Sequence, residues 1–185
     1  MSCTATALPG VFVLAPPLFE DARGTFFESF NDRVFRAQTG LEPAFVQDNH
    51  SCSRRGVVRG LHYQVGAPQG KLVRVIAGSV FDVVVDLRKS SPAFGQWIGT
   101  ELSAENRLQL WVPPGCAHGF LALGDGAECL YKSTAYWSPE HERTLAWNDP
   151  QLAIAWPLER AGCVEPVLSD KDRAGVPFAR AEVFA

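Results

Sequence analysis

A run of short β-type segments, each ended by a turn signal, constrains the fold of this chain more than any other feature. Gly- and Pro-containing turns separate the segments, for example at Ala77-Gly78 and Gly124-Asp125-Gly126. Many short strands with such punctuation are typical of an all-β sandwich or barrel. The predicted strands are Ala44–Ser51, Val57–Gln64, Lys71–Ala77, Ser79–Leu87, Gln96–Leu102, Gln109–Val112, His118–Leu123 and Glu128–Thr134.

The first 43 residues predict two strands and one helix. Val11–Ala15 and Thr25–Ser29 have β-type composition, and the turn residues of Asp21–Gly24 lie between them. The helix is expected at 31–40, because Asn31 suits an N-cap and Gly40 suits the end of a helix.

Length and composition predict one soluble domain spanning residues 1–185. Apolar residues make up 46% of the chain and charged residues 20%, which is an ordinary globular composition. The net charge of −3 argues against a nucleic-acid partner.

No apolar run approaches the roughly 20 residues of a membrane helix, and the N-terminus lacks a basic signal-peptide region. Five cysteines without CxxC spacing indicate reduced thiols, so a cytoplasmic location is expected. The aromatic-rich segment 139–185 is expected to pack over the barrel.

The stretch Gln47–Lys71 is unusually rich in His, Gln, Asn and cationic side chains. Polar groups at this density are costly to bury unless they face a ligand, so the stretch predicts a pocket. Strand alternation places Arg59 and His62 on opposite faces of their strand. If both reach one pocket, the strand must bend near Gly60.

Proton transfer is the chemistry that these residues favour. His62 is a candidate base, because imidazole titrates near neutral pH. Tyr131 is a candidate proton donor, since a phenol keeps its proton at pH 7. A carboxylate within Leu168–Asp172 can orient the imidazole. Each residue has a plainer interpretation as packing or surface charge.

A metal-dependent cupin is one alternative, because His62, Gln64, Lys71 and His118 occupy positions similar to the metal ligands of cupin barrels. Gln64 and the cation Lys71 argue against a metal there. A second alternative is a sugar-binding jelly roll without catalytic activity. Bound metal would identify the first, and lack of proton exchange on a keto-sugar would identify the second.

Nine motifs, in order along the chain, resemble the family of dTDP-4-dehydrorhamnose 3,5-epimerases, and they extend from about Val11 to Asp172. They read QDNHS, GVVRGLHYQ, QGKLVRV, SPAFGQW, LSAEN, PPGCAHGF, LYK, PEHERTLAWNDP and LSDKD. The resemblance implies a homodimeric cupin jelly roll without metal or cofactor. It also implies a dTDP-4-keto-6-deoxy-sugar substrate that is inverted at carbons 3 and 5 in dTDP-L-rhamnose synthesis.

By the same resemblance, His62 is the base, Tyr131 the acid, Asp172 the partner that orients His62, and Lys71 the group that stabilises the enolate. Residues 1–45 are expected to contribute to dimer contacts, with Arg23 and Glu28 reaching the partner's site. The implied substrate contacts are Arg23, Glu28, Gln47, Asp48, Asn49, Arg59, Lys71, His118, Glu142 and Lys171.

The sequence departs from the family pattern at two places. Cys116 stands where the family commonly has Phe, which affects packing beside His118. The segment Ala135-Tyr136-Trp137 lies in a region that differs among relatives inverting a single carbon, so a mono-epimerase remains an alternative.

Overall fold

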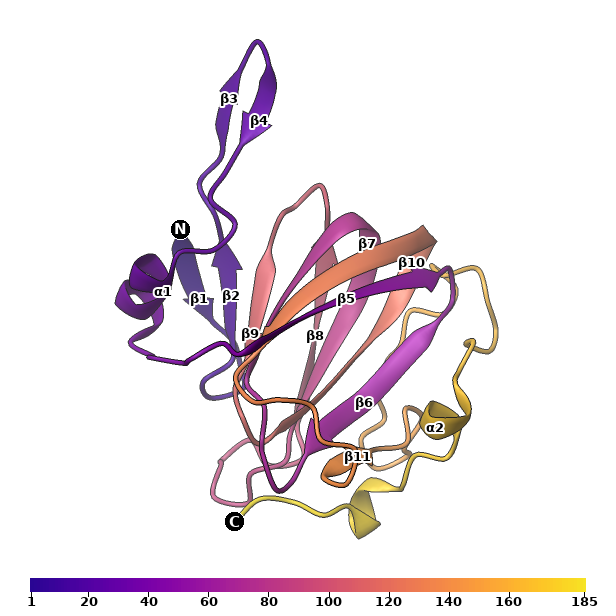
Figure 1. Ribbon diagram of the computed structural model, residues 1–185. Coiled ribbons are helices and arrows are strands. Elements are labelled where there is room, and N and C mark those ends of the chain that lie inside the picture. The colour runs from indigo at the N-terminus through magenta and orange to yellow at the C-terminus, as the bar shows by residue number, and fades with distance from the viewer.

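Two long antiparallel strands, β7 (Lys71–Asp86) and β10 (Cys116–Ser133), run through both layers of the molecule (Figure 1). The first part of β7 and the second part of β10 pair with β9 (Gln109–Val112) and β5 (Gln47–Arg54), forming the β5 layer. The other halves pair with β8 (Trp97–Ser103) and β6 (Val58–Gln64), forming the β6 layer. This computed structural model, which describes residues 1–185, confirms the all-β prediction.

The predicted turns at Ala77-Gly78 and Gly124-Asp125-Gly126 were wrong, because the chain bends there without leaving the sheet. Gly78 has a φ of 70° within β7. On β10, Ala122 pairs with Val80 and Ala127 with Gly78, so residues 123–126 oppose Ser79 alone. Glycine permits such bends, and these bends carry each strand from one layer into the other.

The N-terminal part adds strands to the edge of the β5 layer. Strand β1 (Ser2–Ala5), which the sequence did not predict, pairs with β2 (Phe12–Ala15), and β2 pairs with β9. Strands β3 (Phe19–Asp21) and β4 (Gly24–Phe26) form a separate hairpin that projects from the body (Figure 1). Strand β11 (Glu142–Thr144) pairs with β6 in the other layer.

The predicted helix is confirmed as α1 (Asp32–Thr39). The Asn31 side chain accepts a hydrogen bond from the Val34 amide at 3.2 Å, and Gly40 ends the helix with a φ of 70°. Two shorter helical segments, α2 (Asp170–Arg173) and η1 (Phe178–Arg180), lie near the C-terminus. None of the helices combines the length and the hydrophobicity needed to cross a membrane.

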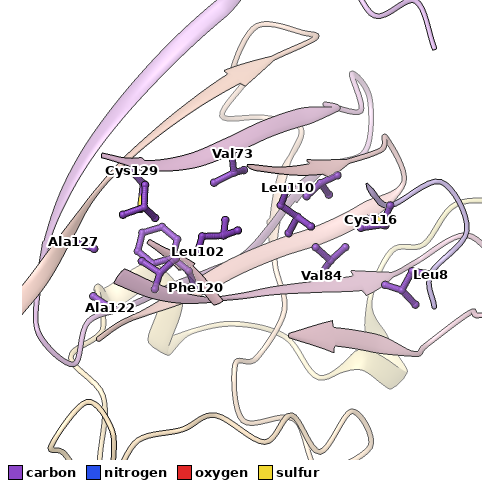
Figure 2. Packing of buried hydrophobic residues seen from close by; sticks show 14 of the residues in the cluster. Leu8, Val73, Val84, Leu102, Leu110, Cys116, Phe120, Ala122, Ala127 and Cys129 are labelled. Atoms are coloured by element: carbon purple, nitrogen blue, oxygen red, sulfur yellow. The ribbon is translucent and has the colours of Figure 1, made fainter. Parts of the chain in front are cut away.

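The main hydrophobic core fills one part of the space between the two layers (Figure 2). Val73, Leu110 and Cys129 come from the β5 layer, whereas Val84 and Phe120 come from the β6 layer. All five side chains are buried. Because apolar residues occupy this part, the polar inward-facing residues collect in another part of the same interior.

The outer faces of the two layers are covered by the ends of the chain. Leu145, Leu152 and Phe178, all from the C-terminal segment, pack on the outer side of the β6 layer. Phe35 of α1 packs with Trp111 on the outer side of the β5 layer. The β5 strand itself keeps exposed residues on its outer side.

Strand β6 bends at Gly60, as the sequence predicts. His118 of β10 pairs with His62, but Phe120 pairs with Arg59, so β6 contains one extra residue between the two pairs. Gly60 has a φ of 123°, and a Cβ there would lie 2.6 Å from the Gly119 Cα. The bend lets both Arg59 and His62 line one cavity.

We predict that Gly60→Ala destabilises the protein by more than about 3 kcal/mol, because a methyl group there clashes with backbone as well as requiring a strained φ. Gly24→Ala is the matched control, since Gly24 has a φ of 120° with no atom near the added methyl group. We expect this control to cost no more than about 1–2 kcal/mol. Urea unfolding of both variants measures the difference, and equal losses would contradict the role of the close contact.

Candidate active site

A polar cavity of about 390 Å³ lies between the two layers beside the hydrophobic core. Its walls come from both layers and from the segments carrying Glu142 and Lys171. Nine of the residues predicted from the sequence line it, namely Gln47, Asn49, Arg59, His62, Lys71, His118, Tyr131, Glu142 and Lys171. The sequence did not predict the contributions of Ser51, Gln69 and Trp137.

His62 forms a short hydrogen bond with Asp172, since its Nε2 lies 2.5 Å from the Asp172 Oδ1. Asp172 is buried in α2, where the Ser169 hydroxyl donates to its other oxygen at 2.7 Å. Burial opposes ionisation of Asp172, but the hydrogen bonds from His62 and Ser169 outweigh it and lower the pKa of the carboxyl. An ionised Asp172 therefore accepts the Nε2 proton of His62.

Burial lowers the pKa of His62 below its ordinary value, although the hydrogen bond and charge of Asp172 act in the opposite direction. The nearby cations Lys171 and Lys71 lower the pKa further. His62 is therefore neutral at pH 7. With the proton on Nε2 directed at Asp172, the lone pair is on Nδ1, which is the arrangement a general base requires.

Lys71 is a buried cation at the start of β7. Burial lowers its pKa to about 8, while the carboxylates of Glu142 and Asp82 act against the shift. Most of the Lys71 side chains are charged at pH 7. A positive charge in so poorly solvated a position favours an anion in the cavity.

Tyr131 enters the cavity from the β5 layer, where it pairs with Asn49 of β5. Burial raises the pKa of its phenol, so the proton remains bound at neutral pH. His62 enters from the β6 layer. The neutral base and the neutral acid thus come from opposite layers of the sandwich.

His118 belongs to a second His–Asp pair that sequence reasoning missed. Its Nε2 lies 2.8 Å from the Asp82 Oδ1, and both residues are buried. Asp82 was overlooked because it lies in the apolar strand segment 79–87 and its partner is far along the chain. A charged residue in the middle of so apolar a strand was the available signal.

Two amide side chains hold the segment that carries Trp137 at the cavity. The Trp137 amide donates to the Gln47 Oε1 at 2.9 Å, and the Ser138 amide donates to the Gln64 Oε1 at 2.8 Å. The Gln64 amide group also donates to the carbonyls of Ala67 and Tyr136. Gln64 therefore anchors loops, which explains in structural terms why it is a poor match for a cupin metal ligand.

Three predicted contact residues lie outside this cavity. Asp48 points to the other face of β5 and pairs with Lys132, with 3.0 Å between Asp48 Oδ1 and Lys132 Nζ. Alternation along the strand is the cause, because Gln47 and Asn49 face inward. Arg23 lies in the projecting hairpin and pairs with Asp21, and Glu28 follows that hairpin. Within a single chain the structure does not bring Arg23 and Glu28 to His62.

The fold and the cavity define a jelly-roll enzyme of the cupin type that is arranged for proton transfer. A family profile described as dTDP-4-dehydrorhamnose 3,5-epimerase matches residues 5–180. The chain therefore belongs to the dTDP-4-dehydrorhamnose 3,5-epimerase family, whose members are sugar-nucleotide isomerases, as the sequence motifs predict.

Curated and solved relatives agree with this assignment. The dTDP-4-dehydrorhamnose 3,5-epimerase of Pseudomonas aeruginosa is 56% identical over 184 residues, covering 100% of this chain and 99% of that protein. The Legionella pneumophila dTDP-6-deoxy-D-glucose-3,5-epimerase, solved in complex with dTDP-4-keto-L-rhamnose, has a TM-score of 0.93 at 45% identity, covering 98% of this chain and 94% of that one. A 3'-monoepimerase from Streptomyces bikiniensis, in complex with dTDP-quinovose, has a TM-score of 0.85 at 33% identity, covering 94% and 86%.

The charges in the cavity predict a bell-shaped dependence of kcat/KM on pH. Because the pKa of His62 is lowered, we expect activity to persist to below pH 6.5 and to fall only in more acidic solution, where His62 gains a proton. Activity should also fall as the pH rises through about 8, where Lys71 loses its charge.

Lys71→Arg tests the alkaline limb. An arginine stays charged throughout this range, so the limb near pH 8 should disappear from the residual activity while the acidic limb remains. The shape of the profile is the measured quantity. An unchanged alkaline limb in Lys71→Arg would show that another group titrates there.

Proposed function

We propose that this chain catalyses inversion at carbons 3 and 5 of dTDP-4-dehydro-6-deoxy-D-glucose, giving dTDP-4-dehydro-L-rhamnose. The observation that carries the proposal is the pairing of a neutral imidazole and a neutral phenol from opposite layers around one cavity. Inversion of a stereocentre next to a ketone needs such a pair, because the proton leaves one face of the sugar and another proton arrives on the opposite face.

In the proposed mechanism, the Nδ1 of His62 removes the proton from the carbon next to the 4-keto group. The electrons of that C–H bond form an enolate, whose oxygen the Lys71 ammonium group stabilises. Tyr131 then donates its phenolic proton to the other face of the same carbon. His62 loses its added proton to water and Tyr131 regains one, so each cycle begins with both groups neutral.

Asp172 supports this step without touching the substrate. Its carboxylate accepts the Nε2 proton of His62, with 2.5 Å between the Asp172 Oδ1 and the His62 Nε2. This hydrogen bond keeps Nδ1 available and stabilises the imidazolium as it forms. The remaining cavity residues are assigned to binding. Arg59 and Lys171 supply positive charge for the pyrophosphate, and Gln47 and Asn49 supply amide groups for sugar oxygens.

The projecting hairpin supports the proposal that the enzyme is a homodimer. Phe19 and Phe26 lie on this hairpin with exposed fractions of 59% and 70%. A two-stranded hairpin is marginally stable alone, so these rings favour contact with a second copy of the chain. In that arrangement the hairpin would bring Arg23 and Glu28 to the partner's cavity.

The mono-epimerase alternative is favoured by one observation, the similarity to the 3'-monoepimerase of Streptomyces bikiniensis. Incubation with dTDP-4-dehydro-6-deoxy-D-glucose in heavy water separates the candidates. Deuterium at carbons 3 and 5 together with the L-rhamnose configuration is the expected result. Deuterium at a single carbon would indicate a mono-epimerase, and none at either carbon would indicate a sugar-binding protein.

We predict that His62→Ala lowers kcat by about 10²–10⁴-fold, the usual range for loss of a general base. Tyr131→Phe should retain more solvent exchange than net inversion, because His62 can still remove a proton and return a deuteron to the same face. Rapid-quench NMR in heavy water measures both quantities. A near-normal rate in His62→Ala, or equal loss of exchange and inversion in Tyr131→Phe, would contradict these roles.

Subunit mixing tests whether the hairpin completes the partner's site. His62→Ala and Arg23→Ala should each be poorly active alone. Co-refolding the two variants gives mixed dimers, in which the Arg23→Ala chain keeps an intact cavity and receives an intact hairpin from the His62→Ala chain. Random pairing in a two-fold dimer should restore about a quarter of wild-type activity. Mixing His62→Ala with Tyr131→Phe is the control, because both side chains line the cavity of one chain and no intact site can form. Lack of restoration in the first mixture would refute the exchange of hairpins.

A further inference from the structure

A second group of chemically reactive side chains lies on the outer surface of the β5 layer, on the opposite face of β5 from the catalytic cavity. His50 and Cys52 are two residues apart on β5, so they share a face, and Glu128 of β10 pairs with Cys52. The ligand atoms of these three residues all lie within 4.8 Å of one another. Ser51, which lies between His50 and Cys52, and Asn49, which precedes them, face the cavity.

The distances within this group approach those of a metal site. The His50 Nε2 lies 3.1 Å from the Glu128 Oε2 and 4.0 Å from the Cys52 Sγ. Zinc bonds of about 2.0–2.3 Å at tetrahedral angles place ligand atoms roughly 3.3–3.8 Å apart. Small rotations of three partly exposed side chains are enough to reach that arrangement, because the paired strands already fix the backbone.

We propose that His50, Cys52 and Glu128 form a binding site for a divalent transition-metal ion, with zinc as the best fit. Imidazole, thiolate and carboxylate are all zinc ligands, and the thiolate selects against magnesium and calcium. Three protein ligands leave the fourth position of the tetrahedron to water. The exposed fractions of the His50 and Glu128 side chains, 48% and 43%, leave the site open to an ion from solution.

Cys52 differs from the chain's buried cysteines in a way that suits this role. Burial raises the pKa of Cys116 and Cys129 to about 12, so their thiolates do not form near neutral pH. Cys52 is exposed and lies beside a histidine. Metal binding displaces a thiol proton, and an accessible thiol can lose it to solvent.

The site joins the two strands that supply Asn49 and Tyr131 to the cavity, since these two residues pair across β5 and β10. The Cys52 carbonyl also accepts a hydrogen bond from the Arg59 guanidinium at 3.1 Å. A bound ion would therefore fasten one wall of the cavity from outside. Because the ion binds only the folded arrangement of strands, it should raise the melting temperature.

Cobalt and zinc titrations of reduced, tag-free protein test the proposal. Wild-type protein should bind one Co²⁺ per chain with a thiolate-to-cobalt charge-transfer band, and one equivalent of Zn²⁺ should displace it and raise Tm. Cys52→Ser should lose the band and weaken Zn²⁺ binding by at least about 100-fold, since a direct ligand matters more than an outer partner. Glu128→Gln should weaken Zn²⁺ binding, but it should still show the thiolate-to-cobalt charge-transfer band at a high concentration of Co²⁺.

Cys163→Ser is the matched control, because it removes another partly exposed thiol that lies in the C-terminal segment. It should bind both ions as the wild type does. Cys52→His should restore Zn²⁺ binding without the charge-transfer band, which separates loss of a ligand from misfolding. Absence of one-to-one binding in the wild type, or an unchanged band in Cys52→Ser, would overturn the proposal.

Discussion

The hydrogen bond between Asp172 and His62 is the interaction on which the rest of the site depends. It ties the C-terminal segment to β6, with 2.5 Å between the Asp172 Oδ1 and the His62 Nε2. A buried imidazole without a partner would be free to adopt either tautomer, and an unpaired carboxylate at this depth would be costly. The pair removes both problems, because the carboxylate fixes one tautomer and the imidazole proton satisfies the carboxylate. The packing of the C-terminal segment on the β6 layer therefore has a chemical consequence as well as a structural one.

The arrangement of the two layers places an acid opposite this base. Strands β7 and β10 pass through both layers, so their bends set the width of the interior. Apolar side chains fill one part of that interior, and polar side chains line the rest. Burial then shifts the two proton-transfer groups in the direction that the reaction needs, because it keeps His62 unprotonated and Tyr131 protonated. Burial acts against the charge of Lys71, but it lowers the pKa only to about 8, so most of the Lys71 side chains are still charged at pH 7.

Local signals in the sequence predicted the local structure well. Asn31 and Gly40 marked the ends of α1, and Gly60 marked the bend in β6. Glycines at Gly78 and Gly124 were misread as turns because a bend within a strand and a turn use the same residue. Asp82 was missed because its partner His118 is distant in sequence. Asp48 was included through the family resemblance, although it alternates with Gln47 and Asn49 along β5 and therefore lies on the other face of the strand.

Nitrogen-15 NMR of the His62 side chain, followed from pH 5 to 8, tests the central claim most directly. We predict that His62 is neutral at pH 7 with its proton on Nε2, and that it titrates below the ordinary histidine pKa of 6.5. In Asp172→Asn, the preference for the Nε2-protonated tautomer should be lost. A His62 that is protonated at pH 7, or that carries its proton on Nδ1 in the wild type, would contradict the account.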